Sequence, residues 1–287
     1  MTLIVAHRKN GDITLSSDSR ICFGLDDECF DFGIKIFSFD VIIRNGGIGY
    51  LVDGRIENYI HPSIPNIDEF RKYSLGIGVA GSAVFAYTIK EFISSKLNIL
   101  FPMGDHSDLS MVGVMELIRH SYQFVTVELR NVLGSRAKSN FVVTGYCHVE
   151  QKQRAFCFYI EEPNVGRAKF LYKEILQKDG TECFGSGKDI AEEILKAKQG
   201  IKPLRLVREV IESKKDPRVG GGVQHGGFLK EGKCFSVLGV YDIEHTPLAT
   251  DDNEFSPVFE RANPIHLDPL QYPFIRTGGT YVGLDHE

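Results

Sequence analysis

The chain has 287 residues, of which 43% are hydrophobic and 25% are charged. These fractions are ordinary for a globular protein and exclude wholesale disorder and a collagen-like fibre. Lys and Arg total 33 against 38 Asp and Glu, a net charge of −5, so no strong basic field is available for nucleic acid or an anionic membrane. No apolar run approaches the roughly 20 residues of a membrane span, and the N-terminus lacks the features of a signal peptide. We expect a cytoplasmic protein without a nucleic-acid or membrane partner.

The cysteines and histidines give no sign of a metal or cofactor. The nine histidines form no HxxxH or HExxH pair, and the glycine run 220–222 lacks the Lys-Ser/Thr of a phosphate-binding loop. No CxxC pair occurs among the six cysteines, several of which lie in apolar runs. We therefore expect reduced thiols packed as small hydrophobic residues. They are Cys22, Cys29, Cys147, Cys157, Cys183 and Cys234.

The first part of the chain is predicted to begin with a β-hairpin. Leu3 to Arg8 and Ile13 to Ser17 are strands joined by a turn that contains Asn-Gly, the strongest short hairpin signal. A third strand is predicted over residues 34–39. The stretch 40–74 is interpreted as an inserted connection with a short helical candidate at 67–72.

The rest of the chain alternates between blocks of strands and pairs of helices. A buried strand over 75–80 precedes a helix with an apolar stripe at helical spacing. A second long helix is predicted from about Asp108, as N-cap, to about Leu133. Such blocks favour an α+β fold over alternating βαβ units. The later elements are strands at 140–147, 154–160 and 168–172, helices at 189–198 and 203–214, and strands after 222 and at 234–241.

Six short segments, in order, resemble one family. The chain has a hairpin segment that runs from Thr2, after the initiator Met, to Asp18-Ser19-Arg20, and it has Lys35 between two isoleucines. Further along it has Ala80-Gly81-Ser82, a strand at 140–146, Phe184-Gly185-Ser186-Gly187 and Asp216-Pro-Arg-Val-Gly-Gly. The set resembles proteasome β-type subunits and HslV-type peptidases, which are N-terminal-nucleophile hydrolases, as a divergent branch. The resemblance implies a four-layer αββα sandwich of two antiparallel sheets between helical layers, over residues 1–241, with 242–287 an extended tail.

The resemblance also implies a threonine-type peptidase that acts once Met1 is removed. Thr2 would be the nucleophile, and its own α-amine, with an ordinary pKa of about 8, would be the base. Lys35 would place a positive charge beside this site, and Asp18 would hold it by an ion pair. The backbone N–H of Gly81 would stabilise the oxyanion. Ser186 and Asp216 would position the amine.

Five further positions match the substrate pocket of the family. All five are uncharged, so they predict a preference for an apolar residue before the scissile bond; they are Ile21, Gly33, Phe37, Val79 and Ala83. The expected partners are further copies of the chain in a ring or similar oligomer, a peptide or unfolded protein as substrate, and an ATPase. No cofactor and no metal are expected.

The sequence departs from the family pattern in ways that leave alternatives open. Val219 occupies the place of a Ser in the amine-positioning network, and Ser82 replaces the second Gly of a Gly-Gly pair. One alternative is a catalytically silent assembly subunit or scaffold, and another is a small-amide hydrolase. Each site residue also has an ordinary structural explanation, such as a turn for Asp18 or a helix N-cap for Ser186.

Overall fold

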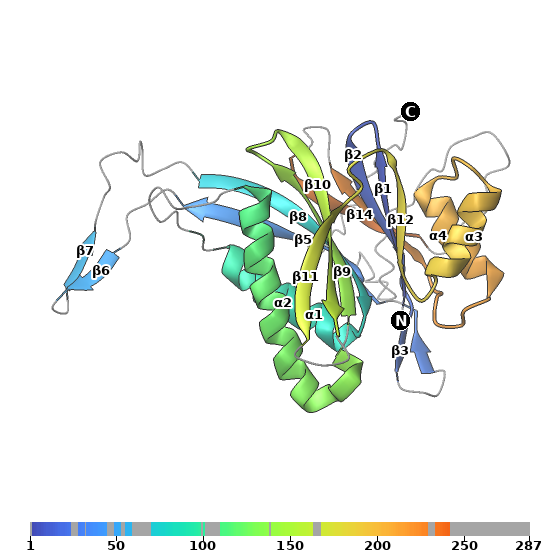
Figure 1. Cartoon of the computed structure of the whole chain (residues 1–287), viewed down its shortest axis with the longest axis horizontal. Coiled ribbons are helices and arrows are strands. Elements are labelled where there is room, and N and C mark those ends of the chain that lie inside the picture. The colour runs from blue at the N-terminus through green and yellow to red at the C-terminus, as the bar shows by residue number, and fades with distance from the viewer. Residues whose placement is uncertain are drawn as a thin grey trace, which may run out of the picture.

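The computed structural model describes residues 2–23, 28–31, 33–44, 49–52, 55–58, 70–98, 100, 110–137, 139–162, 168–228 and 233–241. The predicted tail at 242–287 lies outside the described residues. Within them the fold is α+β, as predicted, with two five-stranded antiparallel sheets (Figure 1).

The first sheet contains the predicted N-terminal hairpin, which is confirmed. Its turn lies at Asn10 and Gly11, where both residues have positive φ. The chain returns to this sheet from far along the sequence, so the hairpin has a late strand on each side. The strand order is β12 (Gly180–Gly185), β1 (Leu3–Lys9), β2 (Asp12–Asp18), β13 (Val223–Phe228) and β14 (Phe235–Tyr241).

The second sheet corrects two predictions about residues 34–74. The expected strand at 34–39 is β5, and it continues to Arg44, paired with β8 from Ile36↔Gly78 to Arg44↔Phe70. The helical candidate at 67–72 is wrong for residues 70–72, which lie in β8. Local pattern could not show this long-range pairing, and it shortens the inserted connection to residues 45–69, where β6 (Gly49–Val52) and β7 (Arg55–Asn58) form a hairpin. The strand order is β11 (Lys169–Ile175), β10 (Lys152–Glu161), β9 (Ser139–Cys147), β8 (Phe70–Gly81) and β5 (Ile36–Arg44).

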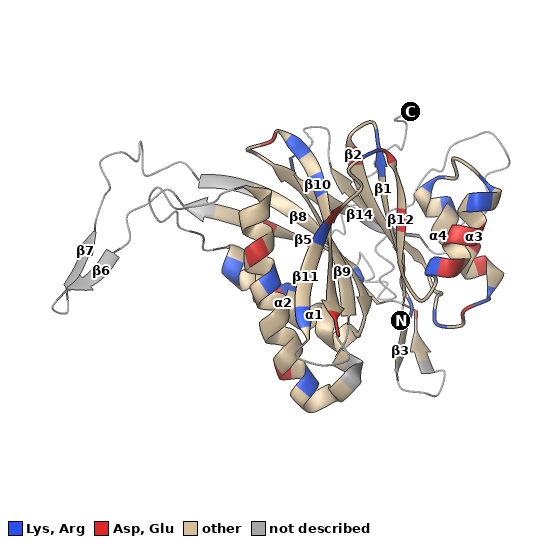
Figure 2. Ribbon diagram, viewed as in Figure 1, with Lys and Arg blue, Asp and Glu red and all other residues tan. Residues whose placement is uncertain are grey.

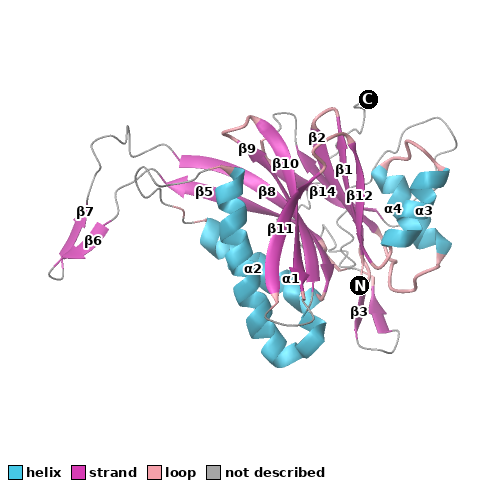
Figure 3. Cartoon of the chain, viewed as in Figure 1, coloured by secondary structure: helices cyan, strands magenta, loops and turns pink. Residues whose placement is uncertain are grey.

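All four predicted helices are present (Figure 3). Helix α1 is capped by Ser82, whose hydroxyl accepts a hydrogen bond from the Phe85 N–H at 3.3 Å. Helix α2 begins later than predicted, because Ser110 is its N-cap, whereas Asp108 lies outside the described residues. No helix among the described residues is long and apolar enough to cross a membrane. The helices are α1 (Ala83–Leu97), α2 (Met111–Leu133), α3 (Lys188–Ala197) and α4 (Pro203–Ser213), with a 3₁₀ turn η2 (Gly134–Ala137) after α2.

Three hydrophobic clusters hold these elements together. One joins α1 and α2 to the second sheet through residues such as Phe85, Tyr122 and Phe141. Another contains Leu15 of the first sheet and Val142 of the second, so the two sheets pack against each other. The third joins Leu3 and Val5 of β1 to α3 and α4. Each helix pair thus packs against a different sheet (Figure 1).

The cysteine prediction is wrong for one pair. Short strands β3 (Ile21–Phe23) and β4 (Glu28–Phe30) place Cys22 opposite Cys29, and the two form a disulfide. Their spacing of seven residues resembles no short motif, so only the hairpin register reveals the pairing. The other four cysteines are free thiols; Cys147, Cys157 and Cys183 are buried and Cys234 is exposed.

A buried histidine lies in the first sheet. His225 of β13 is opposite Ser16 of β2, and its Nδ1 lies 2.8 Å from the Ser16 hydroxyl. Burial and, to a smaller extent, nearby His7 together lower the pKa of His225 to about 4. The ring is therefore neutral in the folded protein at neutral pH.

We predict that His225 makes the fold acid-sensitive. The unfolded chain takes up a proton at this ring near pH 6.5, whereas the folded chain does so only near pH 4. Its contribution to stability is therefore complete above about pH 6.5 and falls by about 3 kcal/mol as the pH approaches 4. The His225→Gln variant should lose about 3 kcal/mol less than the wild type between pH 7 and 4 in urea unfolding. His120→Gln, at an exposed position, is the control, and identical pH profiles for all three proteins would contradict the prediction.

Candidate functional site

The site is built around the carboxylate of Asp18, the last residue of β2. Its side chain is fully buried and accepts hydrogen bonds from five groups. Oδ1 accepts from the Thr2 hydroxyl at 2.7 Å and the Leu3 N–H at 2.8 Å. Oδ2 accepts from Lys35 Nζ at 2.9 Å and from the N–H groups of Arg20 and Gly220 at 3.3 and 3.1 Å. This set of donors compensates for burying a carboxylate.

Thr2 reaches Asp18 because of the hairpin register. Ile4 of β1 pairs with Ser17 of β2, so the residues just before β1 lie beside the end of β2. Thr2 is 1% exposed. Gly185 of β12 lies so close to the Thr2 carbonyl that a Cβ there would overlap it, and Gly185 also has a φ of +96°. A side chain at 185 would therefore displace Thr2.

Lys35 is the positive partner in the site. It immediately precedes β5 and is 6% exposed, and its carbonyl accepts from the Val79 N–H at 3.0 Å. Burial lowers the pKa of the Lys35 ammonium below its ordinary value, although the charge of Asp18 opposes this shift. The structure therefore brings Thr2, Asp18 and Lys35 into one hydrogen-bonded group, as the sequence predicted; their catalytic roles stay predictions.

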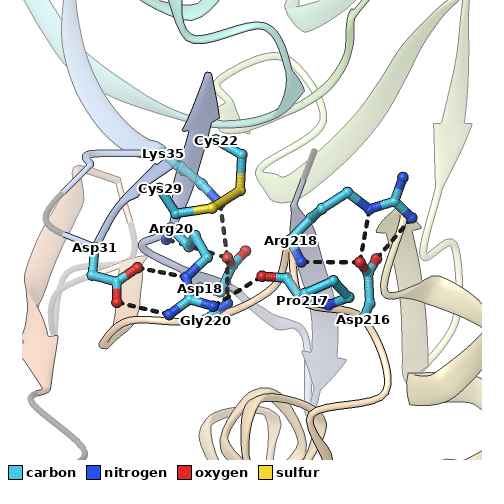
Figure 4. Close-up of a disulfide and its surroundings, with 10 residues drawn as sticks. All are labelled: Asp18, Arg20, Cys22, Cys29, Asp31, Lys35, Asp216, Pro217, Arg218 and Gly220. Atoms are coloured by element: carbon cyan, nitrogen blue, oxygen red, sulfur yellow. Dashed lines mark hydrogen bonds and ion pairs between the residues drawn. A yellow bond between two sulfur atoms is a disulfide. The ribbon is translucent and has the colours of Figure 1, made fainter. Parts of the chain in front are cut away.

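The disulfide hairpin lies beside this group (Figure 4). Arg20 and Asp31, which flank β3 and β4, form a two-armed ion pair with distances of 2.6 and 2.8 Å. Hydrogen bonding to Arg20 lowers the pKa of Asp31. The Ser19 hydroxyl also contacts the Asp31 carbonyl. The hairpin is thus tied to the segment that follows Asp18.

Gly81, the predicted oxyanion donor, is the last residue of β8 and lies two residues before the start of α1; its role stays a prediction. Its φ is +143°, and a Cβ at this position would overlap Ser139 of β9. The Ser82 N–H donates to the Ser139 hydroxyl at 2.8 Å. The departure from Gly-Gly therefore has a structural explanation, because the second position supplies the helix N-cap.

Ser186 and Asp216, unlike Lys35, lie outside the hydrogen-bonded group around Asp18. The Asp216 carboxylate accepts from Arg218 Nε at 2.7 Å, and this pair lies apart from Asp18 (Figure 4). Burial raises the pKa of Asp216, but Arg218 and the nearby Ser186 hydroxyl outweigh burial and leave it below its ordinary value. The buried Ser186 Oγ lacks the geometry of a hydrogen bond to any described group. The neighbouring Gly187 N–H lies 3.5 Å from the Thr2 carbonyl, which places this segment at the N-terminus.

Val219, which replaces the family Ser, is part of the core. It is 3% exposed and packs in the same cluster as Leu3. Its N–H donates to the Asp216 carbonyl at 3.1 Å. This position therefore supports the turn with an apolar side chain and supplies no hydroxyl.

The five predicted substrate positions fall into three groups. Ile21 lies against Gly33, where a Cβ would overlap its side chain. Phe37 and Val79 are buried in the cluster beneath α1, where the Phe37 ring packs edge-on against Tyr87 with centroids 5.7 Å apart. Ala83 is the first residue of α1 and is half-buried. Their role in substrate binding stays a prediction.

Sequence reasoning missed one buried side chain next to Lys35. Gln224 of β13 is 1% exposed and accepts from the Lys35 N–H at 2.8 Å. A polar residue next to Val223 in a predicted strand was the available signal. Across the described ranges, no group of three or more His, Cys, Asp or Glu side chains is arranged to hold a metal ion.

Comparison with known proteins places the fold. The sequence matches no protein-family model and no curated protein sequence. One similar structure is the helical assembly of the Anbu complex from Pseudomonas aeruginosa. Its chain is 14% identical in sequence to this one, and the match covers 84% of this chain and 86% of that chain with a TM-score of 0.54. Anbu, or ancestral β-subunit, from Yersinia bercovieri is 15% identical with coverages of 85% and 88% and a TM-score of 0.53. An Anbu mutant from Hyphomicrobium sp. strain MC1 is 11% identical with coverages of 85% and 88% and a TM-score of 0.55.

These similarities show that the chain shares its fold with Anbu proteins. Anbu is a family distinct from proteasome β-type subunits and HslV-type peptidases. The family expected from the sequence is therefore wrong. Its motifs mark hairpin and strand-to-helix positions of the shared fold, so they do not separate one family with this fold from another.

We predict that the buried charge pair is essential for stability. Asp18→Asn keeps an oxygen for Thr2 and Leu3 but leaves the buried Lys35 without a counter-charge. The free energy of unfolding at pH 7 should fall by about 3 kcal/mol. Asp31→Asn, in the more exposed pair with Arg20, should cost about 1 kcal/mol or less. Equal losses of the free energy of unfolding for the two variants, measured by urea titration, would contradict the prediction.

Proposed function

We propose that this chain is an amide-bond hydrolase with Thr2 as an N-terminal nucleophile, and that it works as a subunit of a proteasome-like homo-oligomer. The observation that supports catalysis is the hydrogen bond from the Thr2 hydroxyl to a buried carboxylate that also binds Lys35. The proposed substrate is a peptide or unfolded protein.

The chemistry depends on removal of Met1. With Met1 in place, the nitrogen of Thr2 is an amide and has no basic lone pair. Once it is an α-amine with a pKa near 8, it can take the hydroxyl proton as Thr2 Oγ1 attacks a carbonyl. The positive charge of Lys35 favours both the neutral amine and the developing negative oxygen. The tetrahedral intermediate then collapses: the amide C–N bond breaks, the α-ammonium of Thr2 gives its proton to the leaving amine, and an acyl-threonine ester remains. Water, deprotonated by the same amine, hydrolyses this ester to the acid and restores the Thr2 hydroxyl.

Ser186 and Asp216 fit the role of holding that amine. The Ser186 hydroxyl, which helps to lower the pKa of Asp216, keeps oxygen lone pairs that can accept a hydrogen bond from a new ammonium or amine group. Asp216 already carries a lowered pKa and is therefore charged at neutral pH. We propose further that the two sheets and two helix pairs form the four-layer arrangement of N-terminal-nucleophile hydrolases, which the three hydrophobic clusters support.

The two helix pairs differ in a way that supports assembly through α1 and α2. Charged residues crowd α3 and α4 (Figure 2), where ion pairs such as Arg208–Glu212 at 2.7 Å suit a solvated surface. The pair α1 and α2 instead exposes several large apolar residues, namely Val84, Tyr87, Val112, Phe124, Val127 and Val132. Grouped exposed apolar side chains mark protein interfaces. The similar Anbu structure from Pseudomonas aeruginosa is a helical assembly, so we propose a second copy of this chain as the partner.

We predict that charges on α2 will reduce the oligomer. The double variant Phe124→Lys/Val127→Lys should have a lower mass by light scattering than the wild type, because Lys is costly to bury at an interface. Val149→Lys lies in the turn between β9 and β10 at a position that is 67% exposed, and it should keep the wild-type mass. An unchanged mass in the double variant would exclude this face.

A catalytically silent assembly subunit is the second candidate. The observation in its favour is that Thr2 is 1% exposed, because a nucleophile must be reached by its substrate. The Anbu similarity supports assembly without supporting catalysis. A small-amide hydrolase would use the same chemistry as the peptidase, and a panel of peptide and small-amide substrates separates these two.

We predict that the mature protein lacks Met1 and reacts with an epoxyketone probe, which bonds to both the hydroxyl and the amine of an N-terminal Thr. Intact mass should show the loss of one Met, followed by one adduct. Thr2→Ser should keep hydrolysis of fluorogenic peptides, whereas Thr2→Ala should lose at least about 1,000-fold. Retained Met1 without an adduct, or equal activity in Thr2→Ala, would favour the silent subunit.

A further inference from the structure

Gln224 bonds the backbone around Lys35 through both ends of its side-chain amide. Its Oε1 accepts from the N–H groups of Lys35 and Ile36 at 2.8 and 3.1 Å. Its Nε2 donates to the Gly33 carbonyl. If the amide were flipped, its NH₂ group would face two backbone N–H donors. These partners therefore fix which end of the amide is the oxygen. Three hydrogen bonds to residues 33–36 thus come from one buried side chain.

These bonds replace those of a missing neighbouring strand. Within the described residues, β5 is the edge strand of the second sheet, and β8 is its one neighbouring strand. The Lys35 carbonyl is bonded on the β8 side by Val79. On the other side, the N–H groups of Lys35 and Ile36 are buried and need acceptors, because an unpaired buried N–H is costly. Gln224 supplies the acceptor from the first sheet.

Gln224 and Asp18 lie on the same pair of strands. In the β2–β13 ladder, Val223 is opposite Asp18 and Gln224 is opposite Ser17. One strand pair therefore holds Lys35 at two points: Asp18 binds its Nζ and Gln224 binds its backbone N–H. A lysine side chain is a flexible chain of four methylene groups, so it has much conformational freedom. Fixing its backbone relative to Asp18 decides whether Nζ meets the carboxylate.

We propose that Gln224 is a positioning residue that sets the place of Lys35 in the Thr2 site. Its catalytic consequence rests on the proposed threonine-nucleophile function, but its structural effect on Lys35 does not.

The first test measures the reactivity of Lys35 in the full-length protein. Wild type, Gln224→Met and Gln153→Met are treated with N-acetoxysuccinimide, and acetylation of Lys35 is followed by peptide mass spectrometry. Gln224→Met has a similar size but no hydrogen-bonding amide, so Lys35 should react about tenfold faster. Gln153 is a matched control, because it is 6% exposed and accepts from a backbone N–H, that of Ile13, at 2.6 Å. Gln153→Met should leave the Lys35 rate within about twofold of wild type.

Equal Lys35 rates in folded Gln224→Met and Gln153→Met would overturn the proposal. If circular dichroism shows that Gln224→Met does not fold, Gln224→Asn takes its place. Its amide is one methylene shorter, so it should give the same faster acetylation, and an unchanged rate in it would overturn the proposal.

The second test uses hydrolysis and separates positioning from general loss of stability. Gln224→Met should lower kcat about tenfold with little change in KM, because Lys35 acts on the reacting atoms. In Gln224→Glu, a protonated carboxyl can accept from Lys35 and donate to the Gly33 carbonyl, so its kcat relative to wild type should rise as the pH falls from 8 to 5. A flat ratio would overturn the positioning role. If wild type shows no hydrolysis, the proposed function fails, and the acetylation rates still decide the role of Gln224.

Discussion

The structure around the N-terminus depends on one buried carboxylate. Asp18 carries a negative charge where water does not reach, and that charge is tolerable because donors converge on it from several segments. They come from the first residues, from the hairpin end, from the start of β5 and from the glycine turn before β13. If the hydrogen bond from one of these segments were lost, that segment would no longer be held against Asp18. Asp18 therefore organises the meeting of the two sheets as well as the candidate site.

Many features of this region were predictable because they are local. The Asn-Gly turn fixes the hairpin register, and the register brings Thr2 to Asp18. An ammonium in an apolar run, as at Lys35, needs a counter-charge, and the family resemblance indicated Asp18, which the structure pairs with it. Helix starts were also accessible, although Ser110 rather than Asp108 is the observed cap of α2.

Other features depend on long-range pairing and could not be predicted from the sequence. Residues 70–72 have no strong pattern of their own and become strand only because β5 is alongside. The Cys22–Cys29 bond depends on the register of a short hairpin. Gln224 is 189 residues from Lys35 in the chain, and no spacing rule relates the two. The family was misjudged for a related reason, because motifs that serve the common fold say little about how individual families diverged.

The Cys22–Cys29 disulfide contributes little to the stability of the Asp18–Lys35 ion pair. Asp18 and Lys35 are 17 residues apart, and the Cys22–Cys29 link bypasses a separation of seven. The entropy of closing a chain loop grows only with the logarithm of its length, so this shortening is worth roughly a few tenths of a kcal/mol at the pair. The pair is thus set almost entirely by hydrogen bonds from folded strands. Its geometry should be nearly the same in oxidising and reducing surroundings.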